Sequence, residues 1–501
     1  MPDTSVNQRF SSRLALLLSV LGIAVGTGNI WRFPRIAAQN GGDEGAAAFL
    51  VVWLLFLFLW SIPLIIAEYA LGSKARAGVV GTFVRTAGKR FAWMGAFVGF
   101  VSTAIMFYYS VVAGWCVYYF FRMSTGALPT QVNEARLIWD SFQASGLPVL
   151  FHLFMMIGAM LAIWYGVQSI ERVNKILIPS LLVIVILSVI RAVTLPGASE
   201  GLAYLFTPQW NQLLRPRIWL EALTQNAWDT GAGWGLIMTY AAYMKREHGV
   251  VKNAFITGIG NNTVSMLAAI MIFCTVFAIL GAEMPRSEVL NIMRDSGPAS
   301  TGLTFIWMPQ LFAKMHMGKV LAILFFLGLS FAAFSSLISM VELSTRALID
   351  WGIPRRKAIP IITSLGFLMG IPSALNLTFL SNQDFVWGVA LMISGAFIAF
   401  AVIRYGVEKL RKEILSHNHK DWNPGKAWDF LMRYLVPLEA IALLLWWMSL
   451  SATVYAPSEW FNPFNPYSVA TCVVQWGAVL LLFYRLNDWM AERLRLPDYT
   501  D

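Results

Sequence analysis

The chain has 501 residues, of which 57% are hydrophobic and 13% are charged. Soluble domains carry roughly 25% charged residues, so this composition excludes an ordinary soluble fold. The formal net charge of +10 does not indicate a nucleic-acid partner, because the basic residues are distributed over loops between apolar runs instead of forming one patch.

Apolar runs recur along the whole chain, each long enough, at roughly 20 residues, to cross a bilayer as a helix. We count about twelve of them by this criterion. They lie near residues 14–38, 47–71, 92–122, 147–166, 173–193, 218–243, 253–281, 318–348, 359–375, 383–406, 428–455 and 466–487. The sequence therefore predicts an all-α polytopic protein that spans a lipid bilayer.

Basic residues concentrate in alternate loops. Lys74 and Arg76 follow the second run, Lys245 follows the sixth, and further lysines and arginines lie within residues 409–426. The acidic pair Asp43 and Glu44 falls in a loop of the opposite set. Because cytoplasmic loops are enriched in Lys and Arg, this pattern predicts that both termini are cytoplasmic.

The first span is interrupted in its middle by the segment GIAVGTGNIWRFPRIAAQNGG, residues 22–42. Glycine weakens a helix and proline removes a hydrogen-bond donor from it. Backbone groups that are freed inside a membrane must find partners within the protein. The interruption therefore indicates a span that lines a site, and a kink of purely structural origin is the alternative.

The sixth span carries the same feature, since its centre reads AWDTGAGWG, residues 227–235. If spans one to five and six to ten are two repeats, the two interruptions hold corresponding positions, a pattern typical of a transporter site between inverted repeats. We therefore divide the chain into a cytoplasmic N-terminal segment (1–12), a first repeat (13–193), an extracellular loop (194–217), a second repeat (218–406), and the last two spans with a cytoplasmic tail (407–501).

Broken helices expose carbonyl groups, which suit a cation, and amide groups, which suit a carboxylate. The eighth span, with FAAFSSLIS, offers further oxygens near such a break. The candidate cation ligands by this reasoning are the backbone around Gly22, Ala24, Val25 and Gly26, the Asn29 side chain, the Ala332 carbonyl, and the hydroxyls of Ser335 and Ser336. Ligation by oxygen alone fits Na⁺, although serines in spans also bond to their own or neighbouring helices.

Several polar side chains inside the spans are further candidates. Asp229 lies at the second interruption, where it is either a fixed negative charge, a proton carrier or a buried structural acid. Arg32 and Asp384 lie near outer span ends and could close an ion pair over the site, or form a rim pair without a gating role. Glu68 and Glu342 are expected to pair structurally. The sequence contains no nucleophile, phosphate-loop or metal motif, so we expect no enzymatic activity.

The first-span segment strongly resembles the signature of the neurotransmitter:sodium symporter family. AEYALG, FYYSVVAGW, ERVNKILIP and FAAFSSLISMVE further down the chain are similar to the same family, and the resemblance covers nearly all of residues 10–400. It implies a 5+5 inverted repeat with broken first and sixth helices. It also implies Na⁺-coupled symport of an amino acid by alternating access, two Na⁺ sites, no organic cofactor, and, for a bacterial member, the inner membrane.

Site residues follow from this resemblance. The implied first Na⁺ site comprises Ala24, Asn29, Asp229 and Asn261, with Asn262 as the alternative if the register is shifted by one. The implied second Na⁺ site comprises Gly22, Val25, Ala332, Ser335 and Ser336. The implied substrate pocket comprises Ala24, Gly26, Gly28, Ile105, Tyr109, Trp228, Gly231 and Met340. The implied gates are Arg32 with Asp384 outside and Tyr243 with Asp350 inside.

Departures from the family pattern carry information about substrate and ions. Gly26 stands where monoamine carriers have an aspartate, so we expect an amino-acid substrate, neutral and apolar or bulky. Asp229 replaces a serine or threonine next to the position where family members bind chloride. By the same resemblance, Gln225 and Ser265 are the other residues at this anion position. We therefore expect Asp229 to supply the negative charge and transport to be independent of chloride.

Two further departures concern the fifth span and the inner gate. Ser169 replaces the family's fifth-span glycine, which argues against unwinding of that helix. Asn7 replaces the N-terminal gating arginine, so Arg9 is the candidate replacement. Two alternatives to Na⁺ symport stay open at this point, namely H⁺ coupling through Asp229 and an amino-acid sensor on the same fold.

Overall fold

The computed structural model describes residues 9–245, 247–295, 301–417 and 420–496, and all of its regular structure within these ranges is helical. Among the described residues, 8 helices are long and apolar enough to cross a membrane, or 11 if each bent helix pair is one span. The sixth predicted span adds to these as the separate pieces α11 and α12. The prediction of a polytopic all-α protein is confirmed.

The helices of the first predicted repeat follow one another with short loops. They are α1 (Arg13–Ala24), α2 (Thr27–Asn40), α3 (Ala47–Phe56), η2 (Leu57–Ser61), α4 (Ile62–Ala75), α5 (Val79–Thr86), η3 (Lys89–Phe91), α6 (Ala92–Thr125), α7 (Val132–Gln143), α8 (Leu147–Ile163) and α9 (Val167–Val193). Helix α9 begins at Val167 instead of the predicted residue 173, because a hydropathy pattern marks the lipid-facing part of a helix and not its polar first turns. Ser169 lies inside this helix.

The second half begins after a connecting segment and repeats the pattern of long helices around a broken one. Its elements are α10 (Ala198–Phe206), η4 (Trp210–Leu214), α11 (Pro216–Asp229), α12 (Leu236–Ala241), α13 (Val250–Leu280), α14 (Arg286–Arg294), η6 (Leu303–Trp307), α15 (Met308–Ala313), α16 (Gly318–Asp350), α17 (Arg355–Leu375) and α18 (Leu377–Tyr405). The remainder comprises α19 (Val407–His417), α20 (Gly425–Phe430), η7 (Leu431–Leu435), α21 (Val436–Leu450), η8 (Ser451–Tyr455), α22 (Val469–Arg485) and α23 (Asn487–Arg493).

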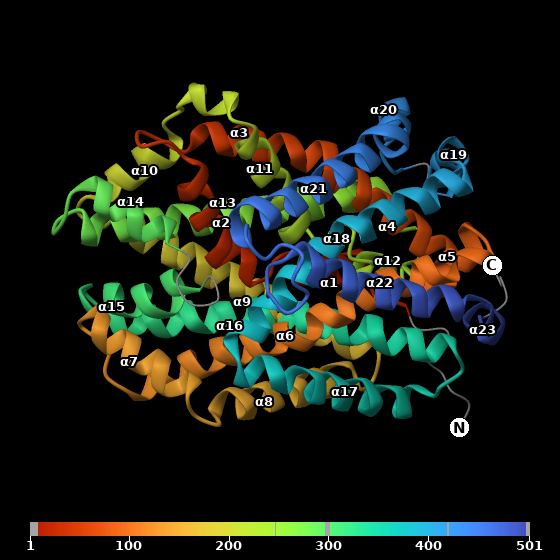
Figure 1. Cartoon of the computed structure of the whole chain (residues 1–501), viewed down its shortest axis with the longest axis horizontal. Coiled ribbons are helices and arrows are strands. Elements are labelled where there is room, and N and C mark those ends of the chain that lie inside the picture. Colours follow the sequence, from red (N-terminus) through yellow and green to blue (C-terminus); the bar gives the residue numbers. More distant parts are fainter. Residues whose placement is uncertain (1–8, 246, 296–300, 418–419, 497–501) are drawn as a thin grey trace.

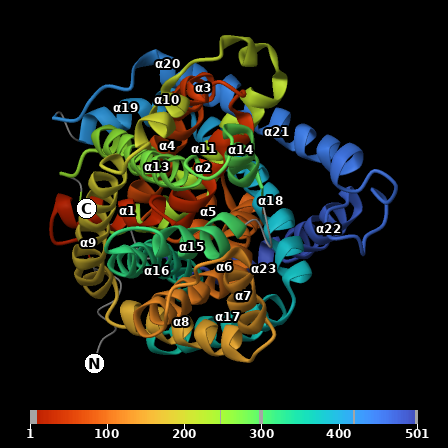
Figure 2. The ribbon, with the colours of Figure 1, turned by 90° about the vertical axis from the view of Figure 1, so that its left-hand side faces the viewer.

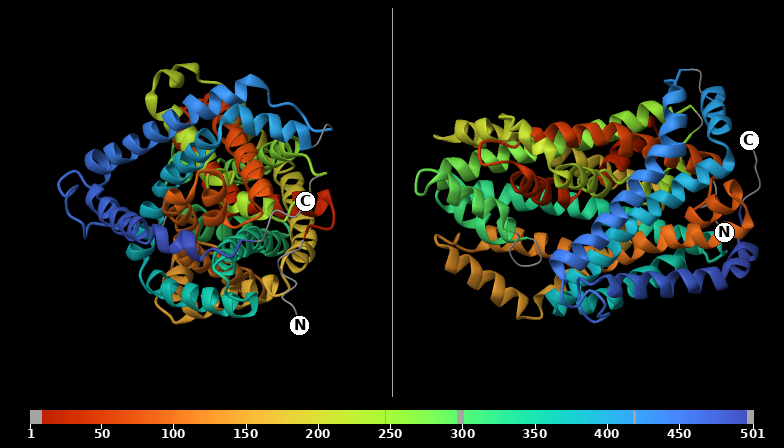
Figure 3. Two further views of the ribbon diagram at one scale, coloured as in Figure 1. Left: turned by 90° about the vertical axis from the view of Figure 1, so that its right-hand side faces the viewer. Right: turned by 45° about the horizontal axis from the view of Figure 1, so that its top comes forward.

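The long helices run along one axis of the molecule, so the protein has two distinct ends (Figure 1). One end carries α5 and α23 together with the first and last described residues of the chain, and we call it the N/C end (Figures 1 and 3). The other end carries the short helices α7, α10, α14 and α15, and we call it the loop end (Figure 1). The described part of the chain therefore begins and ends on the same side of the predicted membrane region.

The centre of the bundle is built from α6 and α16, against which α1, α8, α9, α17 and α18 pack. Helices α21 and α22 lean away from the bundle where they join, and they form an arm on one side of it (Figures 2 and 3). The two broken helices thus lie within a shell of continuous helices, which shields their interrupted backbone from lipid.

Candidate functional site

The first break separates α1 from α2, whose axes differ by 48°. Helix α1 ends at Ala24, Val25 leaves the helical conformation (φ −79°, ψ 88°), and Gly26 is extended. The Gly26 amide donates to Asn29 Oδ1 at 2.8 Å, so one of the freed amides is satisfied by the first turn of α2. The predicted mid-span interruption is therefore present.

The second break runs from residue 230 to residue 235, between α11 and α12. Gly231, Gly233 and Gly235 have φ angles of +71°, +89° and +76°, a conformation that favours glycine over all other residues. The Glu68 side chain of α4 accepts from the amide of Gly233 at 2.7 Å and from that of Met238 at 3.1 Å. Glu68 thus satisfies freed backbone amides of the break, a role that its sequence position alone did not show.

A first cluster of oxygen ligands lies between the two breaks. Asn29 Nδ2 donates to the Asn261 side chain at 2.7 Å. The same end of the Asn261 amide lies 3.0 Å from the carbonyl oxygens of both Ala24 and Asp229. The neighbouring Asn262 only accepts from Asn261, at 3.1 Å, so the register places Asn261 at the cluster. The carbonyl oxygens of Ala24 and Asp229 thus converge on Asn261, and carbonyl oxygens are ligands that a hard cation prefers.

A second cluster joins the end of α1 to the middle of α16. Ser336 Oγ lies 3.2 Å from the Gly22 carbonyl oxygen and 3.3 Å from that of Ala332, and Ser335 Oγ donates to Ala332 at 3.0 Å. The buried amide of Asn174 on α9 lies next to Gly22 and, within the described residues, has no hydrogen-bond partner. Asn174 is a polar neighbour of this cluster that the sequence reasoning missed, because a lone asparagine in a span carries no motif.

The Asp229 carboxylate is buried with two different environments for its oxygens. Oδ2 accepts from Gln225 Nε2 and from Ser265 Oγ, both at 3.2 Å. Oδ1 has no hydrogen-bond partner in the part of the chain that the structure describes. Ser265 in turn accepts from Asn29 Nδ2 at 2.7 Å, so the acid is connected to the first oxygen cluster.

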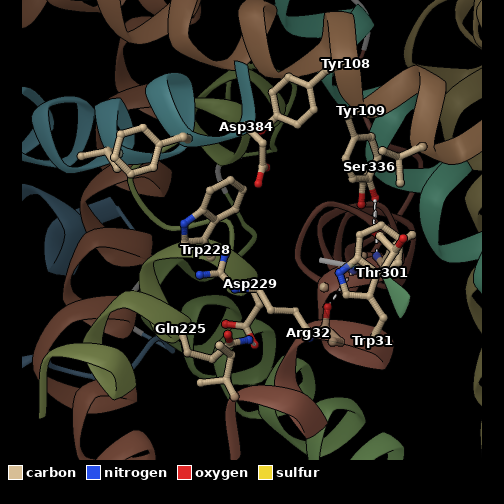
Figure 4. Close-up of a pocket in the computed structure, with 18 of the residues that line it drawn as sticks. Trp31, Arg32, Tyr108, Tyr109, Gln225, Trp228, Asp229, Thr301, Ser336 and Asp384 are labelled. Atoms are coloured by element: carbon tan, nitrogen blue, oxygen red, sulfur yellow. Dashed lines mark hydrogen bonds between the residues drawn. The ribbon is translucent and has the colours of Figure 1, made fainter. Parts of the chain in front are cut away.

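A cavity of about 570 Å³ extends from the two breaks toward the loop end (Figure 4). Its walls include most of the predicted pocket residues, namely Ala24, Gly26, Gly28, Tyr109, Trp228, Gly231 and Met340. Ile105 is not among the lining residues and is fully buried in the bundle. Ile105 lies one turn before Tyr109 on α6 and is covered by neighbouring helices, so its place in the pocket wall stays a prediction.

The predicted outer gate residues line this cavity without touching one another. Within the described residues, no ion pair joins Arg32 to Asp384. The Arg32 guanidinium instead lies over the Trp228 indole, 4.8 Å from the ring centroid (Figure 4). Arg217, Glu221, Tyr455 and Tyr467 line the cavity further toward the loop end. The cavity thus extends past the predicted gate.

The N/C end is closed by a buried network of charged side chains. Asp350 pairs with Arg346, one turn earlier on α16, at 3.0 Å, and also accepts from the Gly78 amide at 2.6 Å. Tyr243 donates to Glu342 at 2.7 Å, and Glu342 pairs with Arg355 at 2.5 Å.

Two contacts near this network concern the expected inner gate of Tyr243 with Asp350, which stays a prediction. Asn7 lies outside the described residues, and Arg9 donates to the Ala242 carbonyl at 3.3 Å. The cation at Asp350 comes from within α16, as Arg346. Sequence reasoning did not single out this pair, since an i, i+4 spacing of opposite charges is common on any helix.

Two helices that are interrupted midway, and whose interruptions line the same cavity, are typical of a secondary transporter. The sequence profile of the sodium:neurotransmitter symporter family matches residues 7–146 and 140–492, so the chain belongs to this family.

Relatives and a solved structure agree with that membership. Uncharacterised sodium-dependent transporters of Bacillus subtilis and Methanocaldococcus jannaschii are 29% and 30% identical, each over 87% of this chain and over 97% and 89% of their own lengths. The sodium-dependent serotonin transporter of Drosophila melanogaster is 28% identical over 87% of this chain and 76% of its own. The crystal structure of MhsT in complex with L-phenylalanine has a TM-score of 0.75 and 31% identity, covering 87% of this chain and 99% of the other.

Proposed function

We propose that this protein is a Na⁺-coupled amino-acid symporter that works by alternating access and does not require chloride. The observation that carries the proposal is the convergence of both helix breaks on the Asn261 amide, with the carbonyls of Ala24 and Asp229 each 3.0 Å from it. One atom cluster thereby connects the two halves of the molecule. A cation bound there would favour one arrangement of the halves, and ion and substrate binding become thermodynamically coupled.

Two Na⁺ sites fit the donor groups that are present. The first would use Ala24, Asn29, Asp229 and Asn261, and the second would use Gly22, Val25, Ala332, Ser335 and Ser336. Both sets consist of oxygen donors, which suits Na⁺. No organic cofactor and no chemical conversion of the substrate are needed for this role.

Asp229 is proposed to replace a bound chloride. Two cations in a pocket of low dielectric need compensating negative charge. The carboxylate has one oxygen between Gln225 and Ser265, and its buried position keeps that charge close to the first cation cluster. A covalently attached anion makes chloride unnecessary.

The substrate is proposed to be a neutral amino acid with an apolar, bulky side chain. The N-terminus of α2 presents the amide of Gly28, and a helix N-terminus attracts a carboxylate. Tyr109 accepts from the Thr27 amide at 3.4 Å, which keeps its own proton available for a bound carboxylate. MhsT, which is 31% identical, binds L-phenylalanine in its crystal structure. We therefore choose phenylalanine as the first substrate to test.

The proposed orientation places the N/C end in the cytoplasm of a bacterial cell, with the protein in the inner membrane. Lysines and arginines gather at that end, in α5, η3 and α19. The cavity then faces the outside and the buried charge network closes the inside, so the structure corresponds to an outward-facing state.

The test is uptake of radiolabelled phenylalanine and other neutral amino acids into proteoliposomes. We expect accumulation that requires an inward Na⁺ gradient, stops when choline replaces Na⁺, and persists when gluconate replaces chloride. Binding without accumulation would indicate a sensor and would overturn the proposal. Strict chloride dependence would overturn the role of Asp229.

Replacing Ser336 by alanine tests the second Na⁺ site. We expect the Na⁺ concentration for half-maximal uptake to rise by roughly ten- to hundredfold, because one oxygen ligand of a charged group is lost. Ser330→Ala on the same helix is the matched control and should leave Na⁺ dependence unchanged, since among the described residues Ser330 bonds only to its own helix, at the Phe326 carbonyl 2.7 Å away. Equal Na⁺ dependence in both variants would contradict the assignment.

H⁺ coupling is the second candidate, and the partnerless Oδ1 of Asp229 favours it. A carboxyl group without a hydrogen-bond donor at one oxygen can hold a proton there. Uptake driven by a pH gradient in choline medium would support this candidate over Na⁺ coupling.

A further inference from the structure

The Trp228 indole lies against a bare stretch of backbone on α18. A Cβ atom built on Gly388 would overlap the indole atom Cζ2 and lie 2.6 Å from Cη2 and 3.0 Å from Cε2. Real Cβ atoms do not approach other atoms so closely, so the indole occupies the space of the side chain that Gly388 lacks. We call this position of the indole on Gly388 the indole seat.

The contacts around the indole seat involve the predicted outer gate. The Arg32 guanidinium lies 4.8 Å from the Trp228 ring centroid, and Trp234 meets the indole edge-on at 6.0 Å between centroids. Gly388 follows Asp384 by one helical turn, so both lie on the same face of α18. The seated indole is therefore held between Arg32 and the face of α18 that carries Asp384 (Figure 4).

The seat also determines how much room the cavity has. Trp228 lines the cavity near the helix breaks, together with Tyr109 and Met340. A side chain at position 388 would displace the indole. Because the cavity is the open space next to the indole, the indole would move into it. Trp is the largest side chain, so its displacement would remove much of the space for a bulky substrate side chain.

We propose that Gly388 is a specificity-determining residue, which holds the Trp228 indole out of the cavity and so admits amino acids with bulky side chains. The inference rests on the proposed transport function for its substrate class. The position of the indole, however, can be measured without transport. Gly388 itself acts through Trp228 and is a positioning residue.

The first experiment compares Gly388→Ala with wild type in proteoliposome uptake of phenylalanine and of alanine. We expect the half-saturating phenylalanine concentration to rise at least tenfold and the alanine value to change less than threefold. Adding Trp228→Phe to Gly388→Ala should restore phenylalanine uptake, because a phenyl ring is smaller than an indole and does not need the seat. Gly477→Ala on α22 is the matched control, since no described atom lies within 4 Å of its added Cβ.

The second experiment reports on the indole without transport. Met340→Cys places a thiol in the cavity wall, and its rate of modification by a charged methanethiosulfonate added from outside is followed in detergent. Gly388→Ala should slow this rate at least tenfold, and Trp228→Phe should restore it. An unchanged rate, or a loss of phenylalanine uptake that Trp228→Phe does not restore, would overturn the inference. Absent uptake by wild type alongside the predicted change in rate would overturn only the proposed transport function.

Discussion

Replacing Asp229 by asparagine is expected to lower Na⁺-driven uptake in chloride-free medium by at least about hundredfold. Breaking a buried charged arrangement by removing one member typically costs about 3–5 kcal/mol, and each 1.4 kcal/mol is a factor of ten. Asparagine keeps the size of the side chain but not its charge, while the main-chain carbonyl that faces Asn261 at 3.0 Å is retained. The measurement is the initial rate of uptake at saturating Na⁺, with gluconate in place of chloride.

Two companion variants separate charge from geometry. Asp229→Ser restores the residue type that the family resemblance places here, so chloride should rescue its uptake. Asp229→Asn combined with Ser265→Glu moves the carboxylate to a neighbour whose hydroxyl lies 3.2 Å from Asp229 Oδ2, and uptake without chloride should return in part. If neither chloride nor the relocated acid restores uptake, Asp229 does not act as the replacement for an anion.

Replacing Arg346 by alanine is expected to open the N/C end and to lower uptake at least about tenfold, because it leaves the buried Asp350 without its cation. Arg346 and Asp350 are joined at 3.0 Å with side-chain exposures of 5% and 3%. Arg346 also donates to the Arg76 carbonyl at 3.2 Å, so the pair connects α16 to the loop before α5. The measurement is the reaction of a thiol reagent, added from the side of the N/C end, with the cysteine of a Tyr243→Cys variant, and its rate should rise.

The control for this variant is an ion pair of the same spacing on the surface. Lys412 and Glu408 are joined at 2.7 Å with exposures of 68% and 59%, so Lys412→Ala should change uptake by less than about threefold. Adding Asp350→Asn to Arg346→Ala should recover part of the closure, because the unpaired charge is removed. An N/C end that stays closed in Arg346→Ala would show that the N-terminal segment supplies the gating cation.

Some polar contacts around the second break and the cavity could not be predicted from the sequence. Glu68 was expected to pair structurally, but its partners, the amides of Gly233 and Met238, could not be named from the sequence. Likewise, Arg32 and Asp384 were considered as a pair that could close over the site or as a rim pair, and in the structure Arg32 lies over the Trp228 indole. Backbone amides and ring faces carry no signal in a sequence, so such partners emerge only when helices pack.

The sequence by itself determined the membrane class, the approximate spans and the two helix breaks. These features depend on local composition, since a run of apolar residues partitions into lipid and glycines or prolines interrupt a helix wherever they stand. It also indicated, through resemblance, most of the side chains that meet in the cavity. Ala24, Gly26, Gly28, Trp228 and Gly231 lie close to the breaks along the chain, so their grouping could be anticipated, whereas Tyr109 and Met340 come from other helices and were indicated by the resemblance alone.

The tertiary structure decided which side chains pair and which residues face the cavity. Asn261 lies at the first cluster, and Asp350 pairs with Arg346. Ile105 is buried in the bundle, and the Trp228 indole packs against Gly388. Each of these outcomes depends on the rotation and depth of a helix relative to its neighbours. That rotation follows from close packing over the whole bundle, where the fit of many side chains is satisfied at once, and no local stretch of sequence contains it.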